Sequence, residues 1–507
     1  MKENIREKIM MIIFILGLLL TQTSCANQQV EAKIPRNLIQ SLKSTDAEVR
    51  KQTAIILGES GNKKAVKPLI QALKDEDWQV RREAVKALGK LKDDQALKPL
   101  IDKLTDSHWV VQGNAAWALG EIGGNRASKA LITALSHKQP FVRENAAKSA
   151  GKLKIQEAIK PLINLLKDED SQVQQSATEA LSQIGNPQPL IEVLGSKNIL
   201  VRWHAGEALG NIGDKNAIKY LLPLLKEEDK NLRLNIAFAL AKLGNNDGIE
   251  MLINSLKDED EEVKTYAALT LGKVGDKRAV DDLIGLLNDS NINIKAQAIS
   301  ALGNIGEEKV ISHLIPLLND KNAFVQQLSS NALIKIGEPS IKPLMFGLQN
   351  AREKTLKNTI TNTLIKIGTS AITSLIELNE TRTTQNDEIQ WYIGIALGEI
   401  GKTGNDQIFN SLITTLSSEN WYARGGAVIG LGKMKNKQAV EPLIKILKND
   451  SNKTVRMTAI ESLAKIDYKN KRIMNVLVSA SKNDNDSGVR TFAKRIINAL
   501  KTIKENQ

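Results

Sequence analysis

Cysteine is almost absent from this chain of 507 residues, since Cys25 is the only one. No disulfide can form within the chain, and no thiol nucleophile exists beyond that residue. Aromatic residues are also rare, at 4%, so a core must be built mainly from Leu, Ile, Val and Ala. Histidine occurs only four times, which leaves few groups for binding a metal or for acid–base catalysis.

A long hydrophobic run is missing too. The most apolar stretch, residues 9–20, has twelve residues, whereas a helix needs about 20 to cross a bilayer. It follows a basic start and precedes a polar exit, so we interpret residues 1–26 as a signal peptide, with a short polar lead at 27–34. The sequence therefore predicts an exported protein of the cell envelope.

The position of Cys25 leaves two ways of processing open. A bacterial lipoprotein carries its lipidated cysteine here, and Ser24 fits the small residue before it, although Gln22 stands where an aliphatic residue is usual. Ordinary cleavage after Ala26 would instead remove the cysteine. We favour lipidation, which would hold the chain on the periplasmic or extracytoplasmic face of a membrane.

What the chain has in abundance is repetition. A glycine recurs every 31 residues at Gly58, Gly89, Gly120 and Gly151, and it returns with small shifts further along. Nine residues before it stands an apolar residue that is usually followed by Arg or Lys. With degenerate copies the pattern gives about fifteen repeats. A fixed period of this length predicts an α-solenoid.

Residues 65–89 show how one repeat is built. Apolar residues at helical spacing predict a first helix, with Pro68 near its first turn. Asp75 and Asp77 then predict a turn and the N-cap of a second helix. Gly89 comes near the end of that helix, where glycine is common. One repeat has too little apolar surface to fold alone, so its neighbours must complete the core.

The segments 80–89 and 201–210 both match V-R-x-x-A-x-x-A-L-G. This pattern resembles the HEAT repeat, within the short HEAT-like class named after the phycobilisome lyases (PBS lyases). The resemblance covers residues 35–500 and implies an all-α superhelix of about fifteen two-helix repeats, followed by a polar tail at 501–507. It implies little about activity, because such arrays carry many unrelated functions.

The net charge of +13 is spread along the chain. Lysines occur in every part of the array beside acidic loops such as residues 168–170 and 258–260. A basic surface can attract nucleic acid or anionic lipid. Because the charge is dispersed and the chain has an export signal, we expect no nucleic-acid partner, and contact with a membrane only through a lipid anchor at Cys25.

His204 and Glu207 are the most suggestive pair for metal chemistry, because a spacing of three places them on one helix face. Residues 202–210 resemble a repeat of deoxyhypusine hydroxylase, a HEAT-like di-iron family whose ligands come from several His-Glu dipeptides. Here no histidine is followed by Glu, and one His with one Glu is half a metal site. We therefore expect no catalytic residue, no metal and no cofactor.

The second helices offer a candidate binding surface. Positions two, three and six after the leading apolar residue lie opposite the packed alanines on a helical wheel, so we expect an exposed stripe on the concave side. Its residues are Asn114, Trp117, Asn145, Trp203, His204, Glu207, Asn235, Phe238, Tyr266, Trp391 and Tyr392. Asn114, Asn145 and Asn235 occupy the same position in their repeats. They are similar to the asparagines that armadillo arrays pair with a peptide backbone.

These observations predict a non-catalytic envelope scaffold that presents a concave groove to a protein or peptide partner. A second hypothesis is a phycobilin-lyase-like protein that binds or attaches a chromophore. The resemblance suggests it, whereas the export signal argues against it because those lyases act in the cytosol. A third hypothesis, a hydroxylase-like oxidoreductase, is disfavoured by the missing His-Glu pairs.

Overall fold

The structure is a computed structural model that describes residues 35–380 and 388–505. Within these ranges every regular element is a helix, which confirms the predicted all-α solenoid. None of these helices is both long enough and apolar enough to cross a membrane. The predicted signal peptide, Cys25 and the polar lead lie outside the described residues. The chain divides into two compact units, unit 1 (Met1–Met251) and unit 2 (Leu252–Gln507).

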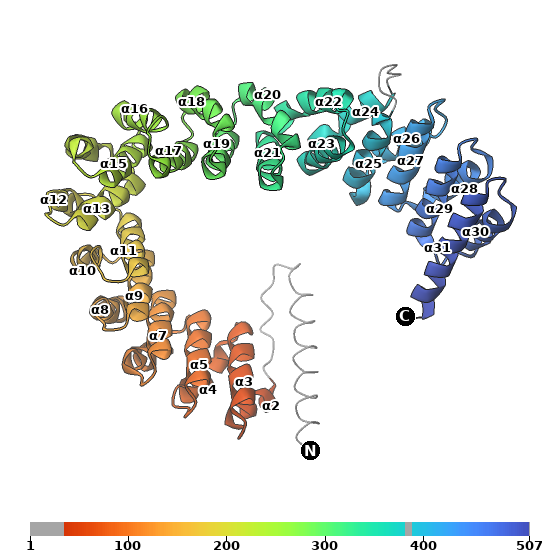
Figure 1. The fold of residues 1–507 in the computed structure, drawn as a ribbon. Helices are drawn as coiled ribbons and strands as arrows, with labels where there is room; N and C mark the ends of the chain where they lie inside the picture. Colours follow the sequence, from red (N-terminus) through yellow and green to blue (C-terminus); the bar gives the residue numbers. More distant parts are fainter. Residues whose placement is uncertain (1–34, 381–387, 506–507) are drawn as a thin grey trace. The chain divides into compact units, whose positions relative to one another are not determined.

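In each unit the even-numbered helices are the first helices of the repeats, and the odd-numbered ones are the second helices (Figure 1). The first helices of unit 1 are α2 (Arg36–Gln40), α4 (Val66–Ala72), α6 (Leu97–Asp102), α8 (Asn125–Ala134), α10 (Ile159–Leu165), α12 (Gln188–Val193) and α14 (Ile218–Leu221), and α16 (Asn246–Ser255) contains the boundary. Its second helices are α3 (Ala47–Glu59), α5 (Trp78–Leu91), α7 (Trp109–Ile122), α9 (Pro140–Lys152), α11 (Ser171–Ile184), α13 (Ile199–Ile212) and α15 (Lys230–Lys242).

Unit 2 repeats the same arrangement. Its first helices are α18 (Val280–Gly285), α20 (Ile311–Leu314), α22 (Ile341–Asn350), α24 (Ile372–Glu380), α26 (Asp406–Thr415), α28 (Val440–Asn449) and α30 (Lys471–Asn483). Its second helices are α17 (Glu261–Val274), α19 (Ile292–Ile305), α21 (Ala323–Ile336), α23 (Lys354–Ile367), α25 (Ile389–Ile400), α27 (Trp421–Met434), α29 (Lys453–Asp467) and α31 (Ser487–Glu505). Fifteen second helices, α3 to α31, thus correspond to the predicted repeats.

Short 3-10 turns adjoin most first helices. Those that follow a first helix are η1 (Ser41–Lys43), η4 (Lys103–Thr105), η7 (Leu222–Lys226), η9 (Leu286–Asn288) and η11 (Pro316–Asn319). Those that precede one are η2 (Lys63–Ala65), η3 (Asp94–Ala96), η5 (Gln156–Ala158), η6 (Lys215–Ala217), η8 (Lys277–Ala279), η10 (Glu308–Val310), η12 (Glu338–Ser340), η13 (Gly368–Ala371), η14 (Gly401–Thr403) and η15 (Lys437–Ala439).

Polar caps set the start of the second helices, and aliphatic residues fill the space between the two layers. Asp77 caps α5 as predicted, since its carboxylate accepts a hydrogen bond of 2.7 Å from the Gln79 amide. The largest fully buried side chains are all leucines, among them Leu69 and Leu88. The core is therefore aliphatic, as the composition predicts.

The recurring glycine lies near the end of the second helix, as predicted, but it does not terminate that helix. Gly89 lies inside α5, and a Cβ there would come within 2.9 Å of both Ala118 and the Trp117 ring. The helix ends instead at residues with a left-handed backbone, such as Lys92 at φ 48° and Gly213 at φ 81°. The recurring glycine lets neighbouring second helices approach closely.

At many junctions an arginine joins one repeat to the next. Arg81 donates from Nη1 to the carbonyl oxygens of Asp75 and Glu76 in its own loop, at 2.8 and 3.0 Å. Its Nε and Nη2 donate to the carboxylate of Asp106 in the next loop, at 2.9 and 2.8 Å. Burial disfavours ionisation of Asp106, but hydrogen bonds from Arg81 and Lys103 outweigh it and hold the pKa at about 2. We call this contact a rung.

Rungs recur in both units, with variations in chemistry. Unit 1 also has Arg50–Asp75, Arg143–Asp168 and Arg202–Glu227, and unit 2 has Lys264–Asp289, Lys295–Asp320, Arg424–Asp450 and Arg456–Asp484. At Gln112 and Gln326 an amide replaces the cation and donates only to the carbonyl oxygen of its own loop, at 2.6 Å in both cases. The residues 25 positions further on are then His137 and Ala351 rather than acids.

Candidate binding surfaces

Neighbouring repeats cover much of the predicted stripe. In each unit the second helices lie on the inner side of the curve (Figure 1). Exposure was expected along the stripe, but His204, Asn235 and Tyr392 are only 3%, 2% and 4% exposed. The expectation is wrong for these residues because each second helix has another second helix on both flanks, and these positions face that neighbour.

The remaining stripe residues are half-buried, so none of the stripe is fully open to solvent. They are Asn114, Trp117, Asn145, Trp203, Glu207, Phe238, Tyr266 and Trp391. Whether the stripe contacts a partner stays a prediction, because burial alone does not test binding.

His204 is occupied by contacts with α11. Its Nδ1 lies 3.0 Å from the Thr178 hydroxyl, and its Nε2 lies 3.2 Å from the Gln174 side-chain oxygen. Glu207 is further away, with its carboxylate 3.8 Å from Nδ1. The described ranges contain no group of three or more His, Cys, Asp or Glu residues placed to hold a metal ion. The residue thus links two repeats.

The large side chains of the stripe fill gaps between second helices. The Trp117 ring lies against Gly89 of α5, and the Trp391 ring lies against Gly425 of α27. The Asn235 amide, oriented so that both its ends are satisfied, donates to the Trp203 carbonyl oxygen at 2.9 Å and accepts from its Nε1 at 3.2 Å. These rings therefore serve the packing between repeats.

The asparagines of the stripe also form hydrogen bonds within the chain. The Asn114 amide donates to the carbonyl oxygen of Val110 at 2.7 Å, and Asn145 donates in the same way to Phe141 at 2.8 Å. Each bond stays within one helix. A peptide backbone would have to compete with these bonds before the asparagines could pair with it.

Exposed aromatic residues gather at the N-terminal ends of three successive second helices in unit 1. We call Trp78, His108, Trp109 and Phe141 the edge row. The Trp78 and His108 rings stack at 3.8 Å between centroids, His108 lies 6.1 Å from Trp109, and Trp109 meets Phe141 edge-on at 5.5 Å. Trp109 remains 47% exposed. The row is continuous, held from three helices, and open to solvent at its centre.

The helix starts explain why the edge row forms. His108 is the N-cap of α7 and its Nδ1 accepts a hydrogen bond of 3.3 Å from the Val110 amide, so Trp109 takes the first helical position. Gly113 leaves room on α7 for the Phe141 ring of α9. The sequence analysis missed this row because a helical wheel groups residues by their angle around the helix axis and takes no account of the helix ends. The available signal was a large aromatic directly after an N-cap residue.

Unit 2 has a smaller aromatic group at a corresponding place. Trp421 and Tyr422 begin α27 after the N-cap Asn420, and their rings stack at 3.8 Å. Trp391 of α25 approaches Trp421 edge-on at 6.3 Å. Trp421 and Tyr422 are both half-buried, so unit 1 presents the more exposed aromatic edge.

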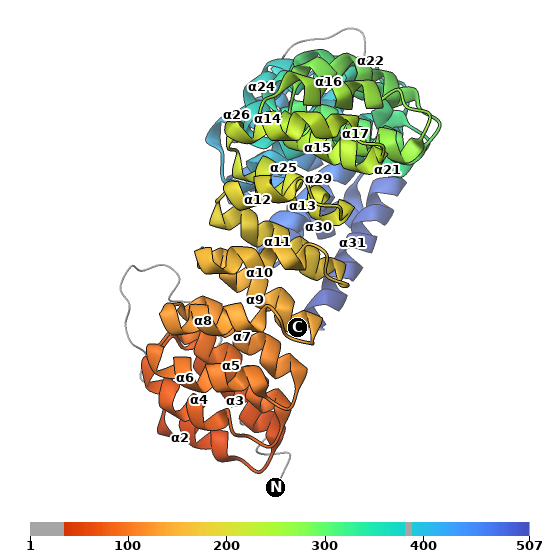
Figure 2. The ribbon, with the colours of Figure 1, turned by 90° about the vertical axis from the view of Figure 1, so that its left-hand side faces the viewer.

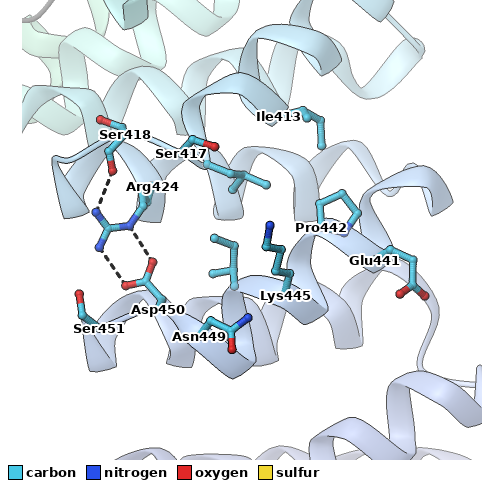
Figure 3. A pocket seen from close by; sticks show the side chains of 12 residues that line it. Ile413, Ser417, Ser418, Arg424, Glu441, Pro442, Lys445, Asn449, Asp450 and Ser451 are labelled. Carbon is cyan, nitrogen blue, oxygen red and sulfur yellow. Dashed lines mark hydrogen bonds and ion pairs between the residues drawn. The ribbon is translucent and has the colours of Figure 1, made fainter.

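Two open pockets have the same place in the repeat. One, of about 860 Å³, lies between α26 and α28 in unit 2, and the other, of about 580 Å³, lies between α8 and α10 in unit 1. Figure 3 shows Arg424 of the first pocket turned towards Ser418 and Asp450. The second pocket has the rung Arg143–Asp168. These charges bond each other, and both pockets are gaps between successive first helices.

Comparisons with solved structures return other helical arrays. Yeast importin-β (Kap95p) has 13% identity and a TM-score of 0.48, over 92% of this chain and 83% of that chain. An engineered protein has 26% identity and a TM-score of 0.28, over 59% and 98%. The CpcE–CpcF complex of the Nostoc phycocyanin lyase has 24% identity and a TM-score of 0.25, over 53% and 93%.

The sequence comparisons are more decisive for the family. No curated protein matches the sequence. The family of HEAT repeats matches residues 35–106, 97–182, 187–258, 249–334 and 409–498, which is most of the chain. Together with the two-layer stacking of helix pairs, this match shows that the chain belongs to the HEAT-repeat family.

Proposed function

We propose that this protein is a non-catalytic scaffold of the cell envelope that holds a protein or peptide partner on its second-helix layer. The observation that carries the proposal is the edge row, with Trp109 exposed at its centre and supported by rings on both sides. Aromatic residues dominate the energy of many protein interfaces, above all where their surroundings hold them in place.

The dimensions of the edge row suit an extended peptide segment. It runs across α5, α7 and α9, and neighbouring packed helices lie about 8–10 Å apart. The row is therefore about 20 Å long, which corresponds to about six residues of extended chain. The Glu76 side chain, two residues before Trp78, is 89% exposed and lies 3.6 Å from Arg50, and the Arg82 guanidinium lies 5.5 Å from the centre of the Trp78 ring. Charges of both signs therefore flank this end of the row.

A photo-crosslinking amino acid at Trp109 tests where the partner binds. Tyr220 of α14 is the matched control, because it is also an exposed aromatic, at 43%, but lies on a first helix. We expect one protein or peptide adduct from envelope extracts at position 109 and none of the same mass at position 220. Equal labelling at both positions would show that the second-helix layer is not the binding surface.

The purified adduct partner then allows a quantitative test. Trp109→Ala should weaken its binding at least about 30-fold, as expected for the loss of a central aromatic anchor worth about 2 kcal/mol. The melting temperature should barely change, because nearly half of the ring is already in solvent. Tyr220→Ala should bind normally. If Trp109→Ala binds with unchanged affinity, the edge row is not part of the interface.

For the location we propose lipidation of Cys25 after removal of the signal peptide. Such a residue carries more than one acyl chain, and two chains anchor firmly where a single chain would be marginal. Cys25→Ser should therefore release the protein into the soluble fraction or stall its processing, as measured by cell fractionation and N-terminal sequencing. A natural N-terminus at Asn27, with unchanged fractionation of the variant, would contradict the proposal.

A further inference from the structure

A column of lysines runs along the outer layer of unit 1. Each first helix contains a fully buried leucine, and the residue two positions before it is exposed. In five of the six first helices from α4 to α14 that residue is lysine: Lys67, Lys98, Lys129, Lys160 and Lys219. Only α12 differs, with Gln188. We call the five residues the lysine column.

The column is not neutralised by the protein itself. Lys67, Lys98, Lys129 and Lys160 form no ion pair or side-chain hydrogen bond with any residue of the described ranges. The ammonium group of Lys219 lies 4.8 Å from the centre of the exposed Tyr220 ring. Some other unit 1 lysines find acids, as Lys103 does with Asp106 at 2.8 Å, whereas others, such as Lys74 and Lys167, form no ion pair within the described residues.

Helix stability does not explain the lysines either. Lys67, Lys98 and Lys160 lie in the first turn of their helix, where the helix dipole favours acids and disfavours cations, whereas Lys219 belongs to the last turn of the short helix α14. The first turns of α4, α6, α8, α10 and α14 contain no acidic residue. Lysine at these places costs a little stability, so it points to something outside the chain.

In unit 2 the position two residues before the buried leucine is occupied by other residues. Asp281 stands there in α18 and pairs with Lys309 at 2.7 Å, and Glu441 stands there in α28 and pairs with Arg472 at 2.6 Å. Both acids lie in the first turn of their helix. Lys342 of α22 is the one lysine at this position among the first helices α18 to α28. The unpaired positive column is therefore specific to unit 1.

The geometry of the column suits an extended anionic surface. The first helices α4 to α14 follow one another along one face of unit 1 (Figure 2), and successive packed helices lie about 10 Å apart. The column is therefore about 50 Å long. Exposed bases beside it, including Lys63, Lys64 and Arg126, add positive charge, and exposed acids of the same layer, Asp94, Asp102, Glu157 and Glu192, offset part of it. A small anion would need converging donors, whereas these side chains are spaced too far apart to meet on one ion.

We propose that the outer layer of unit 1 lies against an anionic lipid bilayer through the lysine column. Each basic residue near such a surface contributes about a fivefold gain in binding. Only nine residues stand between Cys25 and Pro35, and the ten steps from one to the other can span at most about 35 Å. The anchor proposed above would thus keep unit 1 beside the membrane, with the second-helix layer facing away and free for a partner.

Lysine reactivity on vesicles tests this proposal with the full chain. The protein is treated with a water-soluble acylating reagent in the presence of vesicles of phosphatidylcholine alone or with 30% phosphatidylglycerol, and each lysine is followed by mass spectrometry. We expect acylation of Lys67, Lys98, Lys129 and Lys160 to slow at least about fivefold on the anionic vesicles only. Lys342 is the matched control and should react equally on both. High salt should remove the protection.

The outcomes separate this inference from the proposed anchor. Added vesicles present the same surface whether or not Cys25 is lipidated, so unprotected lysines overturn the bilayer contact while leaving the location to fractionation. Equal protection of Lys342 would also overturn it, because the contact would not be specific to unit 1. Protection by a soluble acidic polypeptide or by single-stranded DNA, without protection by anionic vesicles, would assign the column to a macromolecular polyanion instead. Replacing the four lysines by glutamine should abolish the preference of the protein for the anionic vesicles, as measured by co-sedimentation.

Discussion

The first rungs of the two units differ, although unit 2 returns to arginine further along, where Arg424–Asp450 and Arg456–Asp484 have distances of 2.7 and 2.8 Å. In unit 1 the rungs Arg50–Asp75, Arg81–Asp106 and Arg143–Asp168 have distances of 2.6 to 2.8 Å between nearly buried side chains. The first rungs of unit 2 use lysine, with Lys264–Asp289 at 3.5 Å and Lys295–Asp320 at 3.9 Å. Further along unit 2, α25 and α27 approach so closely that glycines face each other.

Side-chain geometry accounts for the first part of this difference. The planar guanidinium of Arg81 bonds its own loop and the next loop at the same time, whereas a lysine ammonium is a single point charge that cannot fit both sides with fixed geometry. The comparison teaches that an array can hold its layers by directional polar contacts or by close backbone approach.

Breaking a rung in each unit should give the largest contrast. Arg81→Ala leaves the buried Asp106 carboxylate without its main partner, so opening between α5 and α7 should become easier by about 3–5 kcal/mol. Lys264→Ala should cost less than about 1 kcal/mol, because its pair is longer and more exposed. Hydrogen exchange of the amides in the adjoining helices measures both, since repeat arrays open locally.

A double variant sharpens the same test. Arg81→Gln together with Asp106→Asn copies the amide found at Gln112 and removes both charges of the rung, so it should recover most of the lost protection. Only the Lys103 ammonium, which is 20% exposed, loses its carboxylate. If Lys264→Ala opened its junction as readily as Arg81→Ala, the type of cation would not be what distinguishes the units.

The glycine contact of unit 2 should show an intermediate effect. A Cβ on Gly398 would overlap the backbone of Gly430, so Gly398→Ala should destabilise α25 and α27 by about 1–3 kcal/mol through overpacking. Gly285 lies in α18 with no atom within 4 Å of an added Cβ, and Gly285→Ala should be neutral or stabilise by up to about 1 kcal/mol. Thermal unfolding compares them, and equal effects would contradict the close approach.

Acid should produce the smallest effect, confined to low pH. The folded pKa of Asp106, about 2, lies below its unfolded value of about 3.9. Its contribution to stability is therefore fully present above about pH 4 and is lost as the pH falls towards 2. The difference in protection between wild type and Asp106→Asn should shrink between pH 5 and pH 2.5. A difference that stays constant would show that the Asp106 charge does not stabilise the junction.

The repeat pattern predicted the fold but not the surface. Period, N-caps and aliphatic core follow from local sequence, because each repeat contacts only its neighbours. The role of Gly89 and the burial of His204 depend on what the next repeat places opposite, and a single helical wheel cannot show that. The rungs could have been predicted, because an acid stands 25 residues after Arg50, Arg81 and Arg143. This spacing is easily missed because it joins residues of two different repeats.

The offset of the rungs also bears on how the chain reaches its folded state. Arg81 needs only the 25 residues up to Asp106 before its contact with the next repeat can close. Contacts of such short sequence separation form quickly, and folding can spread along a repeat array from any point. If the chain is exported as proposed above, it leaves a translocation channel with its N-terminus first and can close each rung as the following loop appears. The arginine of the last folded repeat would find its acid as soon as the next loop is available. Little unfolded chain would then be exposed to aggregation or proteolysis.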